Sequence, residues 1–220
     1  MCKTEYFQKY SKKESSRQIM KKNLLLDKDI REPLFDHLEE TYGKIRILEE
    51  KTTGRARADV VMITEDKLYG IEIKSDADTY ARLKKQVRNY DMYYDRNIVV
   101  VGSSHGEHIS EHVPEHWGII TVEADDEGKA DFYTLRNSRD NPKVKDDRKI
   151  TILWRIELNN LLKLNGLPRY PGKSKFFVQQ ALLERVDHEI LWKQVCGELF
   201  EREYHLSKTN SYVRPTGRRT

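Results

Sequence analysis

The sequence predicts an α/β protein with a mixed β-sheet, followed by a helical C-terminal region. Short runs rich in Val and Ile alternate with helical segments in the order α-β-β-β-α-β. The strands expected at 68–75 and 97–103 are joined through a helix, and such a crossover between parallel strands is right-handed. Beyond residue 150, apolar residues recur at helical spacing. These three observations place the sheet before the helical region.

The first element is an amphipathic helix, because Ile30, Leu34, Leu38 and Tyr42 recur every four residues. Pro33 is expected in the first turn of this helix, where a missing N–H costs little. Gly43 is expected to end it.

A second helix is expected from about Asp78 to Tyr94, between the third and fourth strands. The run at 97–103 is continuously apolar, which is typical of a strand buried on both faces. We expect strands at 44–50, 58–64, 68–75, 97–103, 117–124 and 131–137.

The chain divides by composition. Residues 136–149 contain almost no apolar side chain, which indicates a linker. We expect a flexible basic arm over 1–26, a core over 27–137, a linker over 138–149, a helical region over 150–206 and a disordered tail over 207–220. Ser174 and Asp187 are helix caps by type. The helical region is expected to pack on the core, with a helix-turn-helix over 174–199 as the alternative.

Charge and cysteine content limit the classes of function. The net charge is +4 over 220 residues, which permits a nucleic-acid partner without requiring one. Cys2 and Cys196 are too few for a disulfide framework or a cysteine-based zinc site, which fits a reducing cytosol. The N-terminus lacks the apolar run of a signal peptide, and no segment reaches the roughly 18 apolar residues of a membrane span. We therefore expect a cytoplasmic protein without a membrane partner.

The stretch YGIEIKSD, residues 69–76, carries charges inside an apolar strand. Successive strand side chains point to opposite faces, so Glu72 and Lys74 share one face while Ile71 and Ile73 share the other. A strand that only fills a core does not need this charged pair. The alternative is an edge strand whose outer face carries a cross-strand ion pair, Asp59 with Lys74.

The turn before this strand brings a second carboxylate to it. A two-residue loop at 65–66 places Asp59 opposite Glu72, and a loop shifted by one residue places it opposite Lys74. Either register puts all three side chains on one face. Two adjacent carboxylates repel each other unless a cation neutralises them. Oxygen ligands suit Mg²⁺ or Mn²⁺ rather than zinc.

These residues resemble the D-(x)n-E-x-K signature of the PD-(D/E)xK nuclease superfamily, which has the restriction-endonuclease-like fold. The similarity covers roughly residues 44–122 and is closest to a small bacterial and phage subgroup. Its matching segments here are Arg57-Ala58-Asp59-Val60, Gly70 to Ser75, Asp78 to Leu83, Gln86 with Tyr90, and Val99 to Val101. Ala58 stands where the superfamily's name has proline. The resemblance implies an αβββαβ core and a metal-dependent nuclease that acts on DNA rather than RNA.

The expected site combines the strand residues with the following helix. Asp59, Glu72, Lys74 and Gln86 are the expected catalytic residues, with Asp59 and Glu72 binding Mg²⁺ (or Mn²⁺). A further acid would be Glu49, at the end of the first strand, or Glu39 on the first helix; we expect Glu49 as the additional metal ligand. The expected nucleic-acid-binding residues are Arg55, Arg57, Arg82 and Lys85, although a solvated surface is the alternative for such charges.

Two classes of function are consistent with these features. The first is a nuclease, and the second is a catalytically inactive nucleic-acid-binding or phage-defence module on the same fold. The C-terminal helices could serve a homodimer or a protein partner. His108 and His112 have the spacing of helical zinc ligands, but Gly106 and Pro114 interrupt helical geometry, so a surface turn is expected instead.

Overall fold

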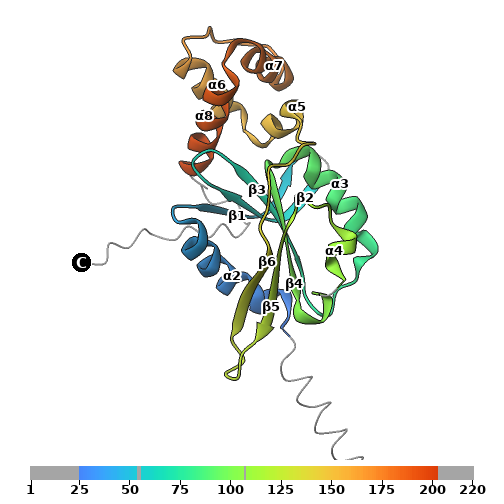
Figure 1. Cartoon of the computed structure of the whole chain (residues 1–220). Coiled ribbons are helices and arrows are strands. Elements are labelled where there is room, and N and C mark those ends of the chain that lie inside the picture. Colours follow the sequence, from blue (N-terminus) through green and yellow to red (C-terminus); the bar gives the residue numbers. More distant parts are fainter. Residues whose placement is uncertain (1–24, 54–55, 107, 203–220) are drawn as a thin grey trace, which may run out of the picture.

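A six-stranded mixed sheet forms the centre of the molecule (Figure 1). The computed structural model describes residues 25–53, 56–106 and 108–202, and within the sheet it describes no side chain over 50–56. The strands, which follow one another in chain order across the sheet, are β1 (Arg46–Thr53), β2 (Ala56–Ile63), β3 (Leu68–Lys74), β4 (Arg96–Gly102), β5 (Gly118–Ala124) and β6 (Ala130–Arg136). The β3–β4 and β4–β5 pairs are parallel and the other pairs are antiparallel. The α/β class and the mixed sheet are confirmed.

Helices cover both faces of the sheet. Helix α2 (Asp27–Tyr42) packs on one face, where its apolar stripe joins the apolar side chains of one hydrophobic cluster. Helix α3 (Leu83–Tyr93) and the short α4 (Ile109–His112) pack on the other face, in a second cluster. The sheet is therefore the middle layer of three, as the continuous apolar run of β4 predicts.

β3 lies in the interior of the sheet, between β2 and β4, and every one of its residues is buried. Ile71 and Ile73 belong to the cluster under α2, and Glu72 and Lys74 project to the face that α3 covers. The alternative of an exposed edge strand is therefore wrong, because the parallel pairing with β4 covers the second edge of β3. Gly70 allows this packing, since a Cβ there would lie 2.3 Å from the Tyr94 ring.

The β2–β3 hairpin has the first of the two predicted registers. Val60 pairs with Ile71, and the Thr64 N–H donates to the Lys67 carbonyl at 3.0 Å, which leaves a two-residue loop at 65–66. Ladder pairing ends at Val60 on the side toward Asp59. The two strands separate there, and this is where the candidate site lies.

α2 begins earlier than its apolar periodicity predicts. The Asp29 carboxylate accepts a hydrogen bond from the Leu26 N–H at 3.1 Å and so holds the first turn at Asp27. Pro33 consequently lies in the second turn, and the expectation that it occupies the first turn is wrong. Gly43 ends the helix as predicted, with a φ of +75° that favours glycine.

α3 begins later than predicted. Asp78 accepts hydrogen bonds from the N–H and Oγ of Ser75 at 2.9 and 2.8 Å, which closes a turn directly after β3. A 3₁₀ turn (Tyr80–Arg82) follows, and the α-helix starts only at Leu83. The carboxylate that looked like a helix start instead stabilises the exit from the strand.

The helical region consists of α5 (Asp146–Lys149), α6 (Arg155–Leu164), α7 (Lys175–Arg185) and α8 (His188–Phe200). Both predicted caps are confirmed. Ser174 Oγ accepts from the Phe177 N–H at 3.1 Å, and Asp187 Oδ1 accepts from the Glu189 N–H at 3.0 Å.

The helical region lies at one end of the sheet and shares a core with it (Figure 1). One hydrophobic cluster contains Val61 and Leu68 of the sheet together with Leu158 of α6 and Trp192 of α8. α8 therefore packs its apolar face in the core that the helical region shares with the sheet.

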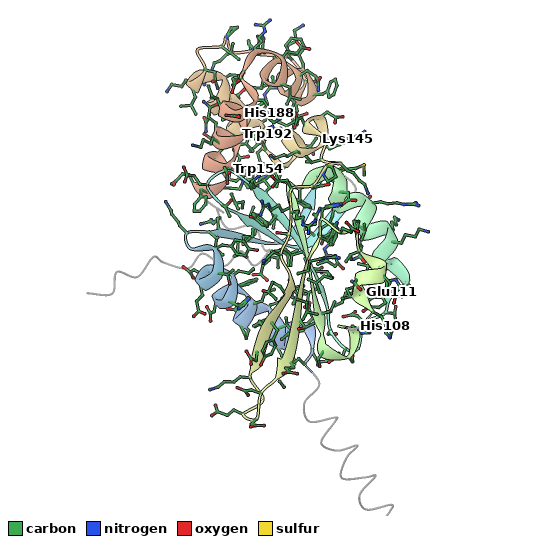
Figure 2. The ribbon with its side chains drawn as sticks, viewed as in Figure 1. His108, Glu111, Lys145, Trp154, His188 and Trp192 are labelled. Atoms are coloured by element: carbon green, nitrogen blue, oxygen red, sulfur yellow. The ribbon has the colours of Figure 1, made fainter. Side chains whose placement is uncertain are left out.

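The segment 138–149, expected to act as a linker, holds polar side chains that are buried against the sheet domain. Asn141 Nδ2 donates to the carbonyls of Asp91 and Tyr94 at 2.9 and 2.7 Å, and so satisfies the C-terminal end of α3. Lys149 Nζ lies 2.7 Å from Asp95 Oδ1 and 3.9 Å from the ring centroid of Trp192. Figure 2 shows Trp192 beside His188 in the helical region.

Two predictions concern segments that the structure does not describe or describes only in part. The basic arm falls outside the described residues except for Leu25 and Leu26, and the tail over 207–220 falls outside them entirely. Across the described part of the chain, no helix combines the length and the apolar character needed to span a membrane.

Candidate active site

The candidate site is centred on Glu72, whose side chain is fully buried beneath α3. Glu72 Oε1 accepts hydrogen bonds from Lys74 Nζ and from Gln86 Nε2. Glu72 Oε2 accepts from the Tyr90 hydroxyl at 2.7 Å. Gln86 and Tyr90 are four residues apart and therefore lie on one face of α3. Three donors from β3 and α3 thus converge on one carboxylate.

Asp59 lies beside this cluster, where β2 separates from β3. Its Oδ2 accepts the Ile73 backbone N–H at 2.9 Å, and its own N–H donates to the Tyr90 hydroxyl at 3.2 Å. Tyr90 therefore connects the backbone of one acidic residue to the side chain of the other. The structure brings Asp59, Glu72, Lys74 and Gln86 together at one place.

The environment of Asp59 disfavours its charged form. Burial, together with the negative charge of Glu72, raises the pKa of Asp59 to about 6. The Ile73 N–H, Lys74 and Arg31 act in the opposite direction but do not cancel these effects. Burial and the nearby acids raise the pKa of Tyr90 well above its usual value, so Tyr90 remains a hydrogen-bond donor.

Replacing Asp59 by Asn is expected to stabilise the metal-free protein at pH 8 and to have little effect at pH 4. A carboxyl whose pKa is raised by folding stabilises the fold while it is protonated, and this contribution is lost as pH rises from about 4 to about 6. The gain at pH 8 should be about 1–3 kcal/mol. Urea unfolding in EDTA across this range measures it, with the exposed Asp126→Asn as control. The prediction would be contradicted if the free energy of unfolding changed with pH in the same way for wild type and Asp59→Asn.

Neither Glu49 nor Glu39, the two candidates for an additional metal-binding acid, lies beside Glu72. The Glu49 carboxylate lies 3.7 Å from Arg31 Nη1, on the face of the sheet that α2 covers. Glu72 projects from the opposite face, so the structure does not bring Glu49 together with it. Glu39 is exposed on α2, which packs on the same face of the sheet as Glu49 and not on that of Glu72. Neither of the two expected acids joins Glu72 here.

Arg31 contributes to the site from the α2 side of the sheet. Its Nη1 donates to the Asp59 carbonyl at 3.3 Å, and its Nε lies 2.6 Å from Asp27 Oδ2. Arg31 was not expected from the sequence, because nothing in the pattern of α2 distinguishes it from a solvated helix residue. Tyr90 was also missing from the expected catalytic residues, although its spacing from Gln86 was a signal.

The expected nucleic-acid-binding residues are distributed around the site. Arg57 is exposed on β2, two residues before Asp59, and Lys85 is exposed on α3, one residue before Gln86. Arg82 is exposed at the end of the 3₁₀ turn. Arg55 lies outside the described residues.

The side chains present suit a hard divalent cation with few protein ligands. Among the described residues, no three or more His, Cys, Asp or Glu side chains are grouped so that they could hold a metal. Mg²⁺, however, usually takes only one or two carboxylates and retains several waters. Gln86 Oε1 is buried without a hydrogen-bond partner, so it is an acceptor that still needs a donor or a cation. Asp59, Glu72 and this oxygen are donors of the type that Mg²⁺ and Mn²⁺ prefer.

The described part of the histidine-rich segment lies on the surface of the protein. α4 has only four residues, and both His108 and His112 are exposed. The His112 ring lies 4.5 Å from the Tyr80 ring, centroid to centroid. Figure 2 shows His108 and Glu111 on the surface, remote from the helical region. This agrees with the surface turn expected from the sequence.

A separate cleft of about 770 Å³ lies between the β2–β3 loop and α8. Its lining includes Glu65, Asp66, Lys193 and Glu198, and none of the expected site residues. The cleft is therefore distinct from the candidate site around Glu72.

Comparison with known proteins identifies a family. Residues 20–220 match the family model described as Bacteriophage P4 protein cII. No curated protein and no solved structure matches the chain. The match indicates a phage origin, and its description names no activity.

Proposed function

The chain belongs to the bacteriophage P4 cII protein family, and we propose that it hydrolyses phosphodiester bonds in nucleic acid, DNA rather than RNA, with Mg²⁺ or Mn²⁺. The observation that carries the proposal is the convergence of Asp59, Glu72 and Lys74 with Gln86. The order α2-β1-β2-β3-α3-β4 also supports it, because the restriction-endonuclease-like fold has this αβββαβ core.

The metal would be held by Asp59 and Glu72, where it would polarise the scissile phosphate and lower the pKa of a bound water. In the metal-free chain, Lys74 supplies the positive charge that Glu72 needs in a buried position. With a cation held by Asp59 and Glu72, the Lys74 ammonium would be available to orient the attacking water or to stabilise the developing negative charge.

Gln86 and Tyr90 would position these groups. The Gln86 amide nitrogen donates to Glu72. Its oxygen would accept a hydrogen bond from the attacking water. The Tyr90 hydroxyl keeps Glu72 in one orientation and supports the backbone at Asp59. The exposed cations Arg57, Arg82 and Lys85 would contact phosphates and orient the strand.

A non-catalytic nucleic-acid-binding module is the second candidate, favoured by one observation. Glu72 is completely buried, and donors from the chain already occupy both of its oxygens. Such a carboxylate could simply stabilise the packing of α3 on β3. The module would bind nucleic acid through the same exposed cations but would not cleave it.

Incubation with supercoiled plasmid, single-stranded DNA and RNA, each with Mg²⁺, Mn²⁺ or EDTA, tests the proposal. Metal-dependent cleavage of DNA that is absent in EDTA supports it. Binding without cleavage under all these conditions would contradict it and support the module. The Asp59→Asn variant, which retains an oxygen acceptor, is the control for a contaminating nuclease.

Asp59→Ala is expected to weaken Mn²⁺ binding by at least about tenfold, because even the loss of a group that only supports a ligand typically costs this much. Calorimetric titration of Mn²⁺ into wild type and variant measures the change. Glu49→Ala is the matched control and should bind Mn²⁺ as wild type does, since Glu49 lies on the other face of the sheet. Equal binding by wild type and Asp59→Ala would exclude Asp59 as a ligand.

A further inference from the structure

The connection between α6 and α7 carries an unusual surface. Residues 163–183 contain four basic residues and no acidic residue. We define the basic aromatic surface as Arg169, Tyr170, Lys173, Lys175, Phe176 and Phe177. The connection from α6 to α7 runs over the end of the helical region farthest from the sheet (Figure 1).

Two of the three aromatic side chains of this surface are exposed, whereas Tyr170 is partly buried against the core. Phe176 is 66% exposed and Phe177 is 41% exposed, whereas Val178 and Leu182 on the same helix are fully buried. The core therefore does not account for Phe176. Exposed aromatic rings between unneutralised cations are typical of surfaces that bind single-stranded nucleic acid, where bases stack on rings and phosphates lie on the cations.

The surface is also held in a defined shape. The Arg155 guanidinium donates to the carbonyls of Lys173 and Tyr170, both at 2.9 Å. Arg185 Nη1 donates to the Tyr170 hydroxyl at 2.9 Å. The Tyr170 and Phe177 rings meet edge to face with centroids 5.1 Å apart. Binding would therefore require little ordering of the loop, which favours affinity.

Arg169 and Lys173 remain available to a ligand, whereas Lys175 Nζ donates to the Thr151 carbonyl at 3.1 Å. Lys173 Nζ lies 5.2 Å from the centroid of the Phe177 ring. Within the described part of the chain, no carboxylate forms an ion pair with Arg169, Lys173 or Lys175. Glu157, a nearby acid, is buried and paired with Arg202. The net charge of the surface is thus positive and complementary to phosphate.

We propose that the basic aromatic surface binds single-stranded nucleic acid, with a base stacked on Phe176 and phosphates on Arg169 and Lys173. The proposal shares its class of partner with the proposed nuclease function but does not depend on cleavage. It gives the helical region a function as a second contact with nucleic acid, remote from Glu72.

Fluorescence anisotropy with a labelled 20-nucleotide oligothymidylate in EDTA tests this assignment without cleavage. Phe176→Ala is expected to weaken binding roughly five- to hundredfold, because stacking on an aromatic ring contributes this much per base. Lys173→Glu should weaken binding and reduce its salt dependence. Tyr133→Ala and Lys129→Glu, exposed residues in the β5–β6 hairpin, are the matched controls and should bind as wild type does.

Two further measurements make the test decisive. Phe176→Ala should leave binding to a duplex of the same length nearly unchanged, since paired bases cannot stack on the ring. Equal losses for duplex and single strand, or unchanged single-strand binding in both surface variants, would overturn the proposal; the latter would favour a protein partner. An oligouridylate distinguishes RNA from DNA. Loss of binding in Phe176→Ala alongside an inactive wild type would reject the nuclease function and leave this inference standing.

Discussion

Replacing Lys74 by Met is expected to reduce metal-dependent DNA cleavage by roughly 10²–10³, equivalent to about 2–4 kcal/mol of transition-state stabilisation. Lys74 is only 5% exposed and its ammonium lies on the Glu72 carboxylate. Met retains the length and most of the volume of the side chain but removes the charge. Initial rates on linear DNA with saturating Mg²⁺ measure the loss.

The buried position of Lys74 also affects the fold, so stability must be measured beside activity. Removing one partner of a buried ion pair destabilises a protein, although Glu72 would retain donors from Gln86 and Tyr90. Rates should be compared well below the melting temperature of the variant. Cleavage within about twofold of wild type by folded Lys74→Met would exclude Lys74 from the mechanism.

Lys74→Arg separates the two roles open to the lysine. Arginine keeps the positive charge but does not deprotonate at accessible pH, so it cannot act as a general base. Substantial rescue by Arg relative to Met would assign Lys74 as a fixed positive charge. Equal inactivity of the two variants would favour the general base.

Glu157→Ala is expected to destabilise the protein by about 3–5 kcal/mol, which lowers the melting temperature by roughly 6–20 °C. Both oxygens of this buried carboxylate accept hydrogen bonds from Arg202. The Arg202 guanidinium also lies 4.3 Å from the Trp154 ring and donates to the Ile152 carbonyl at 3.0 Å. Without Glu157, a positive charge would stay buried and uncompensated.

Urea unfolding and thermal melting measure this effect. Glu127→Ala is the matched control, because the Glu127–Lys129 pair at 2.7 Å is exposed and should contribute under about 1 kcal/mol. Similar losses in the two variants would show that the buried pair is no more stabilising than a surface pair. In that case the Arg202 side chain would have moved out to solvent in the Glu157→Ala variant.

Local patterns were enough to predict many elements. Strand alternation in β3 depends on adjacent residues, so the opposite orientations of Ile73 and Lys74 could be deduced from the sequence. The register of the β2–β3 hairpin depends on a two-residue loop, and the caps Ser174 and Asp187 depend on residues within one helical turn. Each of these features involves residues that are close in the chain.

Glu49 shows the limit of local patterns. Strand alternation puts Glu49 on the same face as Ile47. Whether this is also the face of Glu72 depends on how β1 pairs with β2. The structure pairs Glu49 with Val60, whose side chain lies in the cluster under α2. A carboxylate two strands from Glu72 thus lies on the wrong side of the sheet for the site.

The sequence by itself determined the α/β class, the mixed sheet and the shared face of Glu72 and Lys74, because periodicity and turn length are encoded locally. Only the tertiary structure decided that this pair is buried, since the pairing of β3 with β4 and the packing of α3 join residues far apart in the chain. The same long-range packing brings Tyr90 onto Glu72 and Arg31 onto the Asp59 carbonyl. Burial raises the energy of every unpaired charge, and so makes these partners necessary.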